Sequence, residues 1–414
     1  SAIQNVKAKY LGNIPKSIEI YENNLKNEIA LYNKLIYDEE ISNHPSLQKI
    51  SLWRSKLISL NEEKTALENF LNKNYPSYYS LKYNYNVIKI NEIQNKLNKD
   101  QIIIEYTYTD STIFIFLVSK NNFIIKEVNI DSTFNTQVMN LLKSISCNNF
   151  SKINKNEFYK YIYSAFTLYK ALIYPIEKNI TTENIIIIPD GILNYIPFEI
   201  LISSLPYDDR LEYRTLSYLI KKYTISYSYS ATLLYNNIYK KEKAPQNLIA
   251  FAPEYNNKNF TYDSISFLLK PLPGAINEIN DISKIIKTNM FLKDKATETQ
   301  FKQNVVNYDI IHLAMHTIIN NENPLYSKLV FYSPDDNKED GFLNTYEIFN
   351  LKLNARLAVL SACNTGYGKL SNGEGVMSLA RSFMYAGCPN IVMTLWQIED
   401  KSSSEIMANF YKNL

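Results

Sequence analysis

The chain has 414 residues, of which 46% are hydrophobic and 21% are charged, and this composition excludes an intrinsically disordered protein. At roughly 100–200 residues per domain, the length predicts two to four domains. The formal net charge is +3 and only 5 of the 44 basic residues are arginines, so the sequence argues against nucleic acid as a direct partner.

The first part of the chain has the pattern of a helical hairpin. Residues 14–41 carry apolar side chains at spacings of three and four, which marks one face of a helix. After a break at Pro45, a second apolar series predicts another long helix, antiparallel to the first. Pro76 ends this hairpin, and a shorter helix is expected over about 89–98. We assign residues 1–98 to a helical regulatory region, which can be the tail of a repeat array outside this chain.

From residue 99 the pattern changes from helical spacing to strands. Three β-branched and aromatic runs predict a three-strand meander: Ile102–Tyr108, Ser111–Val118 and Phe123–Val128. The next elements alternate: a helix over about 155–178, strands at Ile185–Ile188 and Tyr223–Tyr227, and a helix from about 231. A lysine-rich stretch before Pro245 closes this part, which we take as residues 99–245.

The last part, residues 246–414, continues the alternation of strands and helices. Five strands are predicted: Leu248–Ala252, Asp309–Ala314, Lys328–Tyr332, Arg356–Ser361 and Ile391–Leu395. Four helices are predicted: about 275–287, about 297–305 with a capping box at Thr297 and Gln300, Val376–Ala386 with Gly387 as its C-terminal stop, and 402–412 with a capping box at Ser402 and Glu405. This alternation indicates α/β layers around a mostly parallel sheet.

Cysteine usage and apolar runs bear on where the protein works. The three cysteines, Cys147, Cys363 and Cys388, are too few and too scattered for a disulfide framework, which favours a reducing compartment such as the cytoplasm. No apolar run approaches the ~18–20 residues of a membrane span, and no signal peptide opens the chain. We therefore expect no membrane partner.

Glycine and cysteine together mark one strand end as a site of chemistry. Of nine glycines, five lie between residues 366 and 387, and a chain this poor in glycine uses it where the backbone must bend or approach a ligand. The cluster follows a buried strand that delivers Cys363 at its carboxyl end. In α/β sheets, that edge is where ligands bind.

Histidine supplies the base that a cysteine needs. A free thiol, with a pKa of ~8.5, is mostly protonated at neutral pH, whereas an imidazole with a pKa of ~6.5 can take and return its proton. His312 and His316 lie at or just beyond another strand end, and His316 precedes Cys363 by 47 positions. If the two strands are near neighbours, His316 and Cys363 emerge at the same sheet edge. His312 is expected to be a buried structural residue.

Residues 100–414 resemble a CHAT domain, a bacterial relative of caspases and separases. The matching segments occur in order along the chain: Ile104–Tyr106, Ile188–Gly191, Asn194–Glu199, Pro273–Ala275, His312–His316, Leu360–Gly366, Gly373–Gly375 and Leu395–Asp400. Proteins of this family are caspase-like in fold and often carry helical TPR repeats ahead of the protease. The resemblance implies a degenerate caspase-like half at 99–245 and an active half at 246–414.

The resemblance also implies a cysteine endopeptidase that acts on a protein substrate without a cofactor. If the roles of the matching family residues apply here, Cys363 is the nucleophile and His316 is the base. The backbone N–H groups of Thr317 and Cys363 then form the oxyanion hole. The family usually has glycine at the position of Thr317, and a β-branched residue disfavours a positive φ. We therefore expect weakened or conditional activity. By analogy with the family, a protein partner that binds the N-terminal helical region is expected to gate the protease.

Substrate binding is expected on the segment that follows the last strand. Four residues would pair with an extended peptide as an added strand: Thr394, Leu395, Trp396 and Gln397. Asp400, with Glu399, stands where separases place an acid for a basic side chain, which favours cleavage after Lys or Arg. Asp400 can instead serve the N-terminus of the following helix. Glu374 is expected to order the glycine loop.

Other functions fit the sequence less well. In the acidic loop 335–341, Lys338 would occupy a ligand position of a calcium site and repel the ion. The histidines and cysteines have no zinc spacing, and no Gly-Lys-Ser/Thr follows the glycine cluster, so we expect no metal and no phosphate loop. Arg381 is expected to be a structural ion-pair partner, and Cys388 a core residue. The alternative function is a non-catalytic, caspase-like scaffold.

Overall fold

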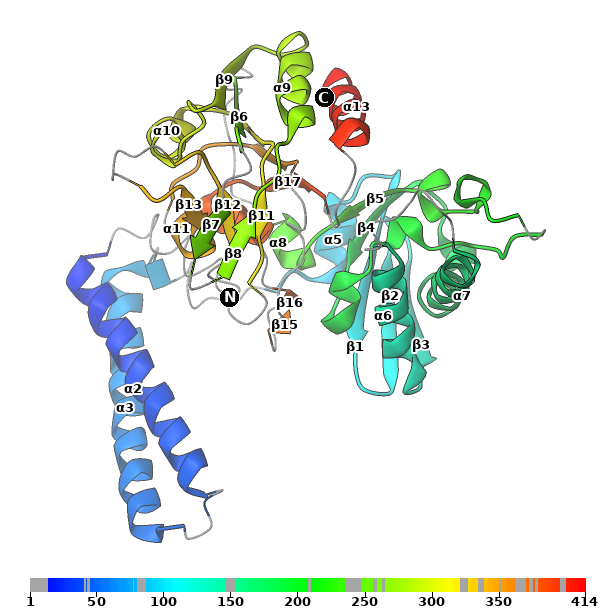
Figure 1. Cartoon of the computed structure of the whole chain (residues 1–414). Coiled ribbons are helices and arrows are strands. Elements are labelled where there is room, and N and C mark those ends of the chain that lie inside the picture. The colour runs from blue at the N-terminus through cyan, green and yellow to red at the C-terminus, as the bar shows by residue number, and fades with distance from the viewer. Residues whose placement is uncertain are drawn as a thin grey trace. The chain divides into compact units, whose positions relative to one another are not determined.

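The computed structural model describes the chain except for residues 1–13, 41, 43–44, 77, 80–86, 146–153, 208–209, 236–246, 256–258, 263–264, 321–326, 334–338, 350, 362–369, 372–374, 377–378 and 395–399. The chain divides into two compact units, Ser1–Val87 and Ile88–Leu414 (Figure 1). Across the described residues, no helix combines the length and apolarity needed to cross a membrane.

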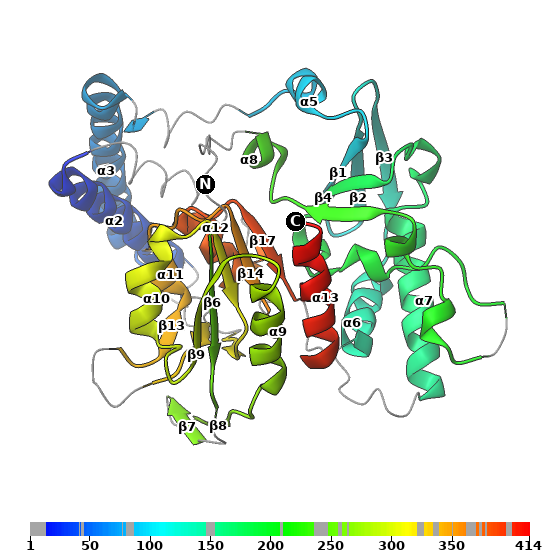
Figure 2. The same ribbon diagram turned by 90° about the horizontal axis from the view of Figure 1, so that it is seen from above.

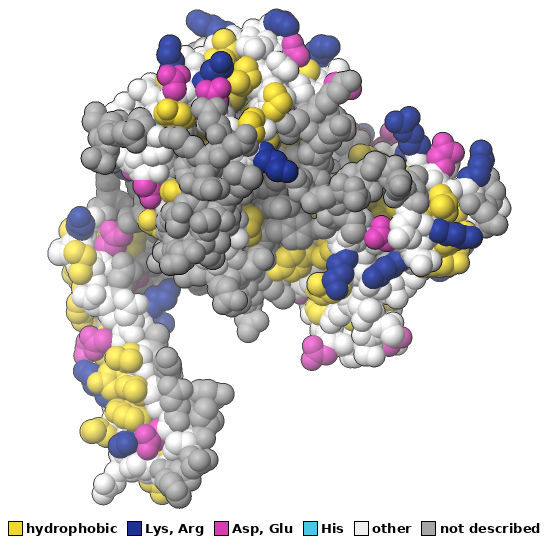
Figure 3. All heavy atoms as spheres, in the orientation of Figure 1, with side chains coloured by type: hydrophobic (Ala, Val, Ile, Leu, Met, Phe, Trp, Pro, Cys, Tyr) yellow, Lys and Arg dark blue, Asp and Glu magenta, His cyan; other side chains and the backbone are white. Residues whose placement is uncertain are grey.

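The first unit is the helical hairpin that the apolar spacing predicts. Helices α2 (Lys16–Glu40) and α3 (Leu47–Asn74) pack against each other, and the Ser46 side chain caps α3 by accepting from the Lys49 N–H. The buried residues between them are Leu25, Leu60, Leu67, Leu71 and Tyr78. The hairpin also exposes large hydrophobic side chains, which gather along it in Figure 3: Ile20, Leu31, Leu52 and Phe70.

The second unit contains two five-stranded sheets. The strands of the first sheet lie in the order β3-β2-β1-β4-β5: β1 (Gln101–Tyr108), β2 (Thr112–Val118), β3 (Phe123–Asn129), β4 (Asn184–Ile188) and β5 (Thr224–Tyr227). The predicted meander is antiparallel, and β4 and β5 extend it in parallel with β1.

Helices cover both faces of the first sheet. Helices α6 (Thr133–Ile145) and α7 (Lys155–Leu172) pack on one face, while α5 (Ile90–Lys96) and α8 (Ala231–Tyr235) pack on the other. Helix α5 therefore belongs with this sheet rather than with the hairpin. Helix α7 ends at Leu172, before the predicted 178, and the chain continues through turns and a short 3-10 helix at Glu177–Asn179. Four more 3-10 turns lie farther along: Gly191–Tyr195, Phe198–Ile200, Tyr213–Thr215 and Leu219–Lys221.

The second sheet is wholly parallel, which confirms the prediction of a mostly parallel sheet. Its order is β17-β14-β10-β6-β9, made of β6 (Leu248–Pro253), β9 (Thr288–Lys293), β10 (Ile310–Leu313), β14 (Leu357–Leu360) and β17 (Asn390–Met393). Helices α9 (Pro273–Ser283) and α13 (Asp400–Lys412) lie side by side on one face (Figure 2). The other face is covered by α10 (Glu298–Asn304), α11 (Thr345–Ile348) and α12 (Leu379–Ala386).

Smaller sheets surround the second one. An antiparallel sheet joins β11 (Thr317–Ile318), β12 (Lys328–Val330) and β13 (Phe342–Asn344), so the predicted strand at Lys328 lies outside the central sheet. Two hairpins pair β7 (Asn259–Tyr262) with β8 (Ile265–Leu268), and β15 (Leu370–Ser371) with β16 (Gly375–Val376). A 3-10 turn at Val305–Asn307 continues α10.

The helix ends match the capping signals in two of three cases. The Thr297 side chain accepts from the Gln300 N–H at 3.2 Å and begins α10. Gly387 ends α12 at φ +114°, where an added Cβ would come within 2.7 Å of the Leu353 carbonyl oxygen. The last predicted helix is present, but its predicted cap is wrong, because α13 begins at Asp400 and Ser402 lies inside its first turn.

Candidate active site

The strands that precede the predicted base and nucleophile are neighbours and end at one sheet edge. Strands β10 and β14 pair in parallel, and Leu313 lies opposite Leu360. His316 follows Leu313 by three residues, and Cys363 follows Leu360 by three. Paired strands lie ~4.8 Å apart, and parallel strands end at the same edge. The neighbouring strands that the sequence argument required are therefore present.

The His316 imidazole is held by a main-chain oxygen. Its Nε2 lies 2.8 Å from the carbonyl oxygen of Lys270. Because a carbonyl oxygen can only accept, Nε2 must carry the hydrogen, and Nδ1 is the nitrogen with the basic lone pair. This contact thus fixes both the ring orientation and the tautomer.

Tyr255 holds the backbone of the same residue. Its hydroxyl accepts from the His316 N–H at 3.1 Å and donates to the Val330 carbonyl at 2.5 Å. The two rings lie 4.6 Å apart, and the Val330 N–H donates to the His316 carbonyl at 3.0 Å. Burial raises the pKa of Tyr255, so its hydroxyl stays protonated at neutral pH. Backbone and ring of His316 are therefore both fixed by neighbours.

Thr317 adopts a conformation that suits its side chain. It is the first residue of β11 and lies opposite Leu329. Lys293 is the non-glycine residue with a positive φ among the described positions, so Thr317 lies outside the left-handed region. The backbone strain expected from replacing the family's glycine is therefore absent here.

His312 is buried and hydrogen-bonded, as predicted. Its Nδ1 lies 3.1 Å from the Tyr411 hydroxyl on α13, and its Nε2 lies 2.9 Å from Glu278 Oε1 on α9. The helices that carry Tyr411 and Glu278 cover the face of the sheet on which Ile310 and Ala314 are buried. This is the face expected from strand alternation.

Most of the predicted substrate-binding residues lie outside the described part of the chain. These are Glu374, Leu395, Trp396, Gln397 and Glu399. The predicted nucleophile, Cys363, also lies outside the described residues. The backbone of Asp400 begins α13, but its side chain is not among those described. Thr394 is described, is mostly buried, and follows β17, the terminal strand of the described sheet.

Two further predictions concern Cys388 and Arg381. Cys388 is fully buried in the core, as predicted. The guanidinium of Arg381, expected to form an ion pair, stacks 4.8 Å above the Tyr229 ring, which joins α12 to the segment after β5.

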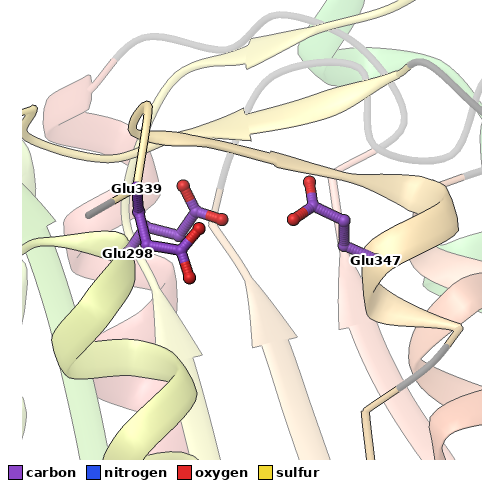
Figure 4. A group of neighbouring side chains, drawn as sticks. All are labelled: Glu298, Glu339 and Glu347. Atoms are coloured by element: carbon purple, nitrogen blue, oxygen red, sulfur yellow. The ribbon is translucent and has the colours of Figure 1, made fainter. Parts of the chain in front are cut away.

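A partly buried group of carboxylates near α10 surrounds a lysine. Figure 4 shows Glu298, Glu339 and Glu347, and the Lys302 ammonium lies 2.7, 3.0 and 2.9 Å from them, respectively. Their oxygens are close enough together to hold a metal ion, but the ammonium contacts all three. Glu347 also completes a capping box with Asn344 at the start of α11.

Burial and the lysine act in opposite directions on these carboxylates. Burial raises the pKa of Glu298 to about 7, although Lys302 opposes it. Burial also acts to raise the pKa of Glu347, but hydrogen bonds from Lys302 and Asn344 outweigh it and lower that pKa. We interpret the group as a structural ion-pair network. The network, Tyr255 and Lys270 were not found from the sequence, because most of the contacts they make join positions that are distant in the chain.

The fold and this edge define an α/β protein with a histidine held just beyond the carboxyl end of a strand in a parallel sheet. The CHAT domain family matches residues 164–414, more than half of the chain, so the chain belongs to that family. It is also similar to tetratricopeptide repeat protein 28 of Homo sapiens and of Mus musculus, at 23% and 22% identity over 179 residues. These matches cover 36% of this chain and 7% of each relative's length. Together they support a TPR-CHAT architecture.

Proposed function

We propose that the protein is a cysteine endopeptidase of caspase-like fold, in which residues 246–414 are the active half and 99–245 the degenerate half. The observation that carries the proposal is the in-register pairing of β10 with β14, which gives His316 and Cys363 the same offset beyond the paired residues Leu313 and Leu360. A second support is the fixed tautomer of His316, because a general base needs its lone pair on a defined nitrogen.

The proposed reaction uses His316 Nδ1 as the proton carrier. Nδ1 takes the proton of the Cys363 thiol, and the thiolate attacks the peptide carbonyl carbon. The backbone N–H groups of Thr317 and Cys363 hold the oxyanion, and the imidazolium then gives its proton to the leaving amine. Water, deprotonated by Nδ1, hydrolyses the thioester and regenerates the thiol. The Lys270 carbonyl stabilises the imidazolium through Nε2–H.

The substrate in this proposal is an extended segment of a protein. Thr394–Gln397 follows the terminal strand β17, and such a strand can accept a peptide as an added strand. Asp400, with Glu399, would accept a Lys or Arg side chain before the scissile bond, and Glu374 would order the glycine loop. Sequencing the new N-termini in a proteome digest tests this preference, because a scattered set of preceding residues would contradict it.

The activity is tested by a substitution and by chemical labelling. Cys363→Ala should reduce hydrolysis by at least about 10³-fold, and processing at the unmodified rate would contradict the proposal. Iodoacetamide or a peptidyl chloromethyl ketone should label Cys363 faster than Cys388, which is fully buried and serves as an internal control. Labelling at equal rates would favour the scaffold alternative.

We also propose that a protein partner binds the helical hairpin and gates the protease. The hairpin exposes Ile20 and Leu31 on α2, 51% and 52% exposed, respectively, and exposed apolar side chains of this size favour docking of another chain. Ile20→Glu with Leu31→Glu should leave basal hydrolysis of a short peptide unchanged and remove its stimulation by cell extract. Equal stimulation of both chains would contradict this role.

A further inference from the structure

We propose that helix α13 is a clamp that holds the carboxyl ends of β10 and β14 in place, with Ser403 and Tyr411 as its two positioning residues. The inference rests on the proposed function, since those strand ends precede His316 and Cys363. It assigns a role to the polar contacts that α13 makes with the two strands.

The first contact joins α13 to the end of β14. The Ser403 hydroxyl lies 3.1 Å from the hydroxyl of Ser361. Ser361 is the residue after β14 and stands two positions before Cys363. Ser403 is buried and the hydroxyl pair is partly buried, so the hydrogen bond is shielded from water and its removal should weaken the contact between α13 and β14.

The second contact joins α13 to β10. The Tyr411 hydroxyl lies 3.1 Å from His312 Nδ1, and Glu278 of α9 lies 2.9 Å from the other ring nitrogen. His312 is 0% exposed and stands four positions before His316. The three polar side chains are therefore linked across two helices and a strand.

The surroundings make these contacts selective for one position of the helix. Ser403, Met407 and Tyr411 are spaced by four and form one stripe of α13, ~12 Å long at 1.5 Å per residue. Met407 packs among apolar neighbours of both strands: Ile310, Ala314, Leu357 and Val359. An apolar layer alone tolerates sliding, whereas buried polar groups must meet their partners. The polar ends of the stripe thus fix the register of α13 on the two strands.

The clamp also connects the two strand ends to the proposed peptide-binding segment. Helix α13 begins at Asp400, and residues 394–399 join it to β17. The position of α13 therefore fixes where this segment ends. A shift of the helix would move the proposed substrate strand and both strand ends together, so the expected defect is in turnover.

The test compares Tyr411→Phe with Tyr106→Phe in the full chain. Tyr106 is a matched control, because its hydroxyl is buried in the first sheet and donates to the Leu172 carbonyl at 3.0 Å. Tyr411→Phe should lower kcat about tenfold with KM within about twofold, since small misplacements of reacting groups reduce turnover strongly. It should also speed amide hydrogen exchange in peptides covering 310–316 and 357–361. Tyr106→Phe should change none of these, although both variants lower Tm.

A second variant and the exchange measurement separate the possible failures. Ser403→Ala should speed exchange mainly in 357–361. Equal exchange and equal kcat in the Tyr411 and Tyr106 variants would overturn the clamp and leave α13 a purely structural helix. If the unmodified chain shows no Cys363-dependent hydrolysis, the proposed function fails, and the exchange rates still decide whether α13 holds the strand ends.

Discussion

Replacement of Tyr255 by phenylalanine tests how much the hydrogen bond to the His316 backbone contributes to stability and to the proposed activity. The change removes only the hydroxyl, which accepts from the His316 N–H at 3.1 Å and donates to the Val330 carbonyl at 2.5 Å. At about 1 kcal/mol net for each hydrogen bond, the variant should lose about 2 kcal/mol of stability. If the hydroxyl stabilises the correctly placed His316 by the same free energy, its removal lowers kcat/KM about 30-fold, since 1.4 kcal/mol corresponds to a factor of ten.

The assay measures urea unfolding and peptide hydrolysis on the same preparations. The control is Tyr161→Phe, because the Tyr161 hydroxyl is also buried and contacts two partners, the Ile200 carbonyl at 2.6 Å and Tyr218. Both variants should lose similar stability, but only Tyr255→Phe should lose activity. A Tyr255→Phe chain with the kcat/KM of the control would show that the hydroxyl does not position the base, and would refute the reasoning.

Three further predictions concern stability. Lys302→Met should destabilise the protein by about 3 kcal/mol at pH 7, because three carboxylates lose the ammonium that contacts them. The control Lys222→Met removes an exposed ion pair and should lose less than about 1 kcal/mol. Urea unfolding measures both. The folded-state pKa of Glu298, about 7, lies above its ordinary 4.5, so its protonation favours the fold below pH 4.5 and this contribution is lost as pH rises to 7. Glu298→Gln should therefore gain up to about 3 kcal/mol relative to the unmodified chain between pH 4.5 and 7, and a flat difference would contradict the assigned pKa. Gly387→Ala should lower stability by about 1–3 kcal/mol, because φ is +114° and the new Cβ would meet the Leu353 carbonyl; an unchanged Tm would count against that strain.

The sequence predicted the elements whose residues carry a strong local pattern. The apolar runs that became β10 and β14 are flanked by polar residues, and the structure pairs them as neighbours. Helix α6 was missed, although Phe134, Val138, Leu141 and Leu142 form an apolar face at helical spacing. Strand β9 was missed because it is an edge strand with half its length exposed, so its pattern resembles a loop.

The support of the site could not be predicted, since it depends on contacts between distant segments. Tyr255 and Lys270 lie 61 and 46 positions before His316, and neither has a motif that singles it out. The network around Lys302 was hidden in the same way, because Glu339 and Glu347 lie 37 and 45 positions from the lysine. The last helix was placed two residues late, because Ser402 gave a plausible capping signal inside the first turn.

The group that holds the His316 ring has an evolutionary consequence. Because it is a main-chain carbonyl, no side-chain replacement at position 270 removes it, and the exposed Lys270 side chain is free to drift among related sequences. The residue that selection should preserve is instead Pro271. A proline restricts the residue before it to extended conformations, and this restriction sets the direction of the Lys270 carbonyl. Sequence conservation in this region should therefore report on the neighbour of the supporting residue rather than on the residue itself.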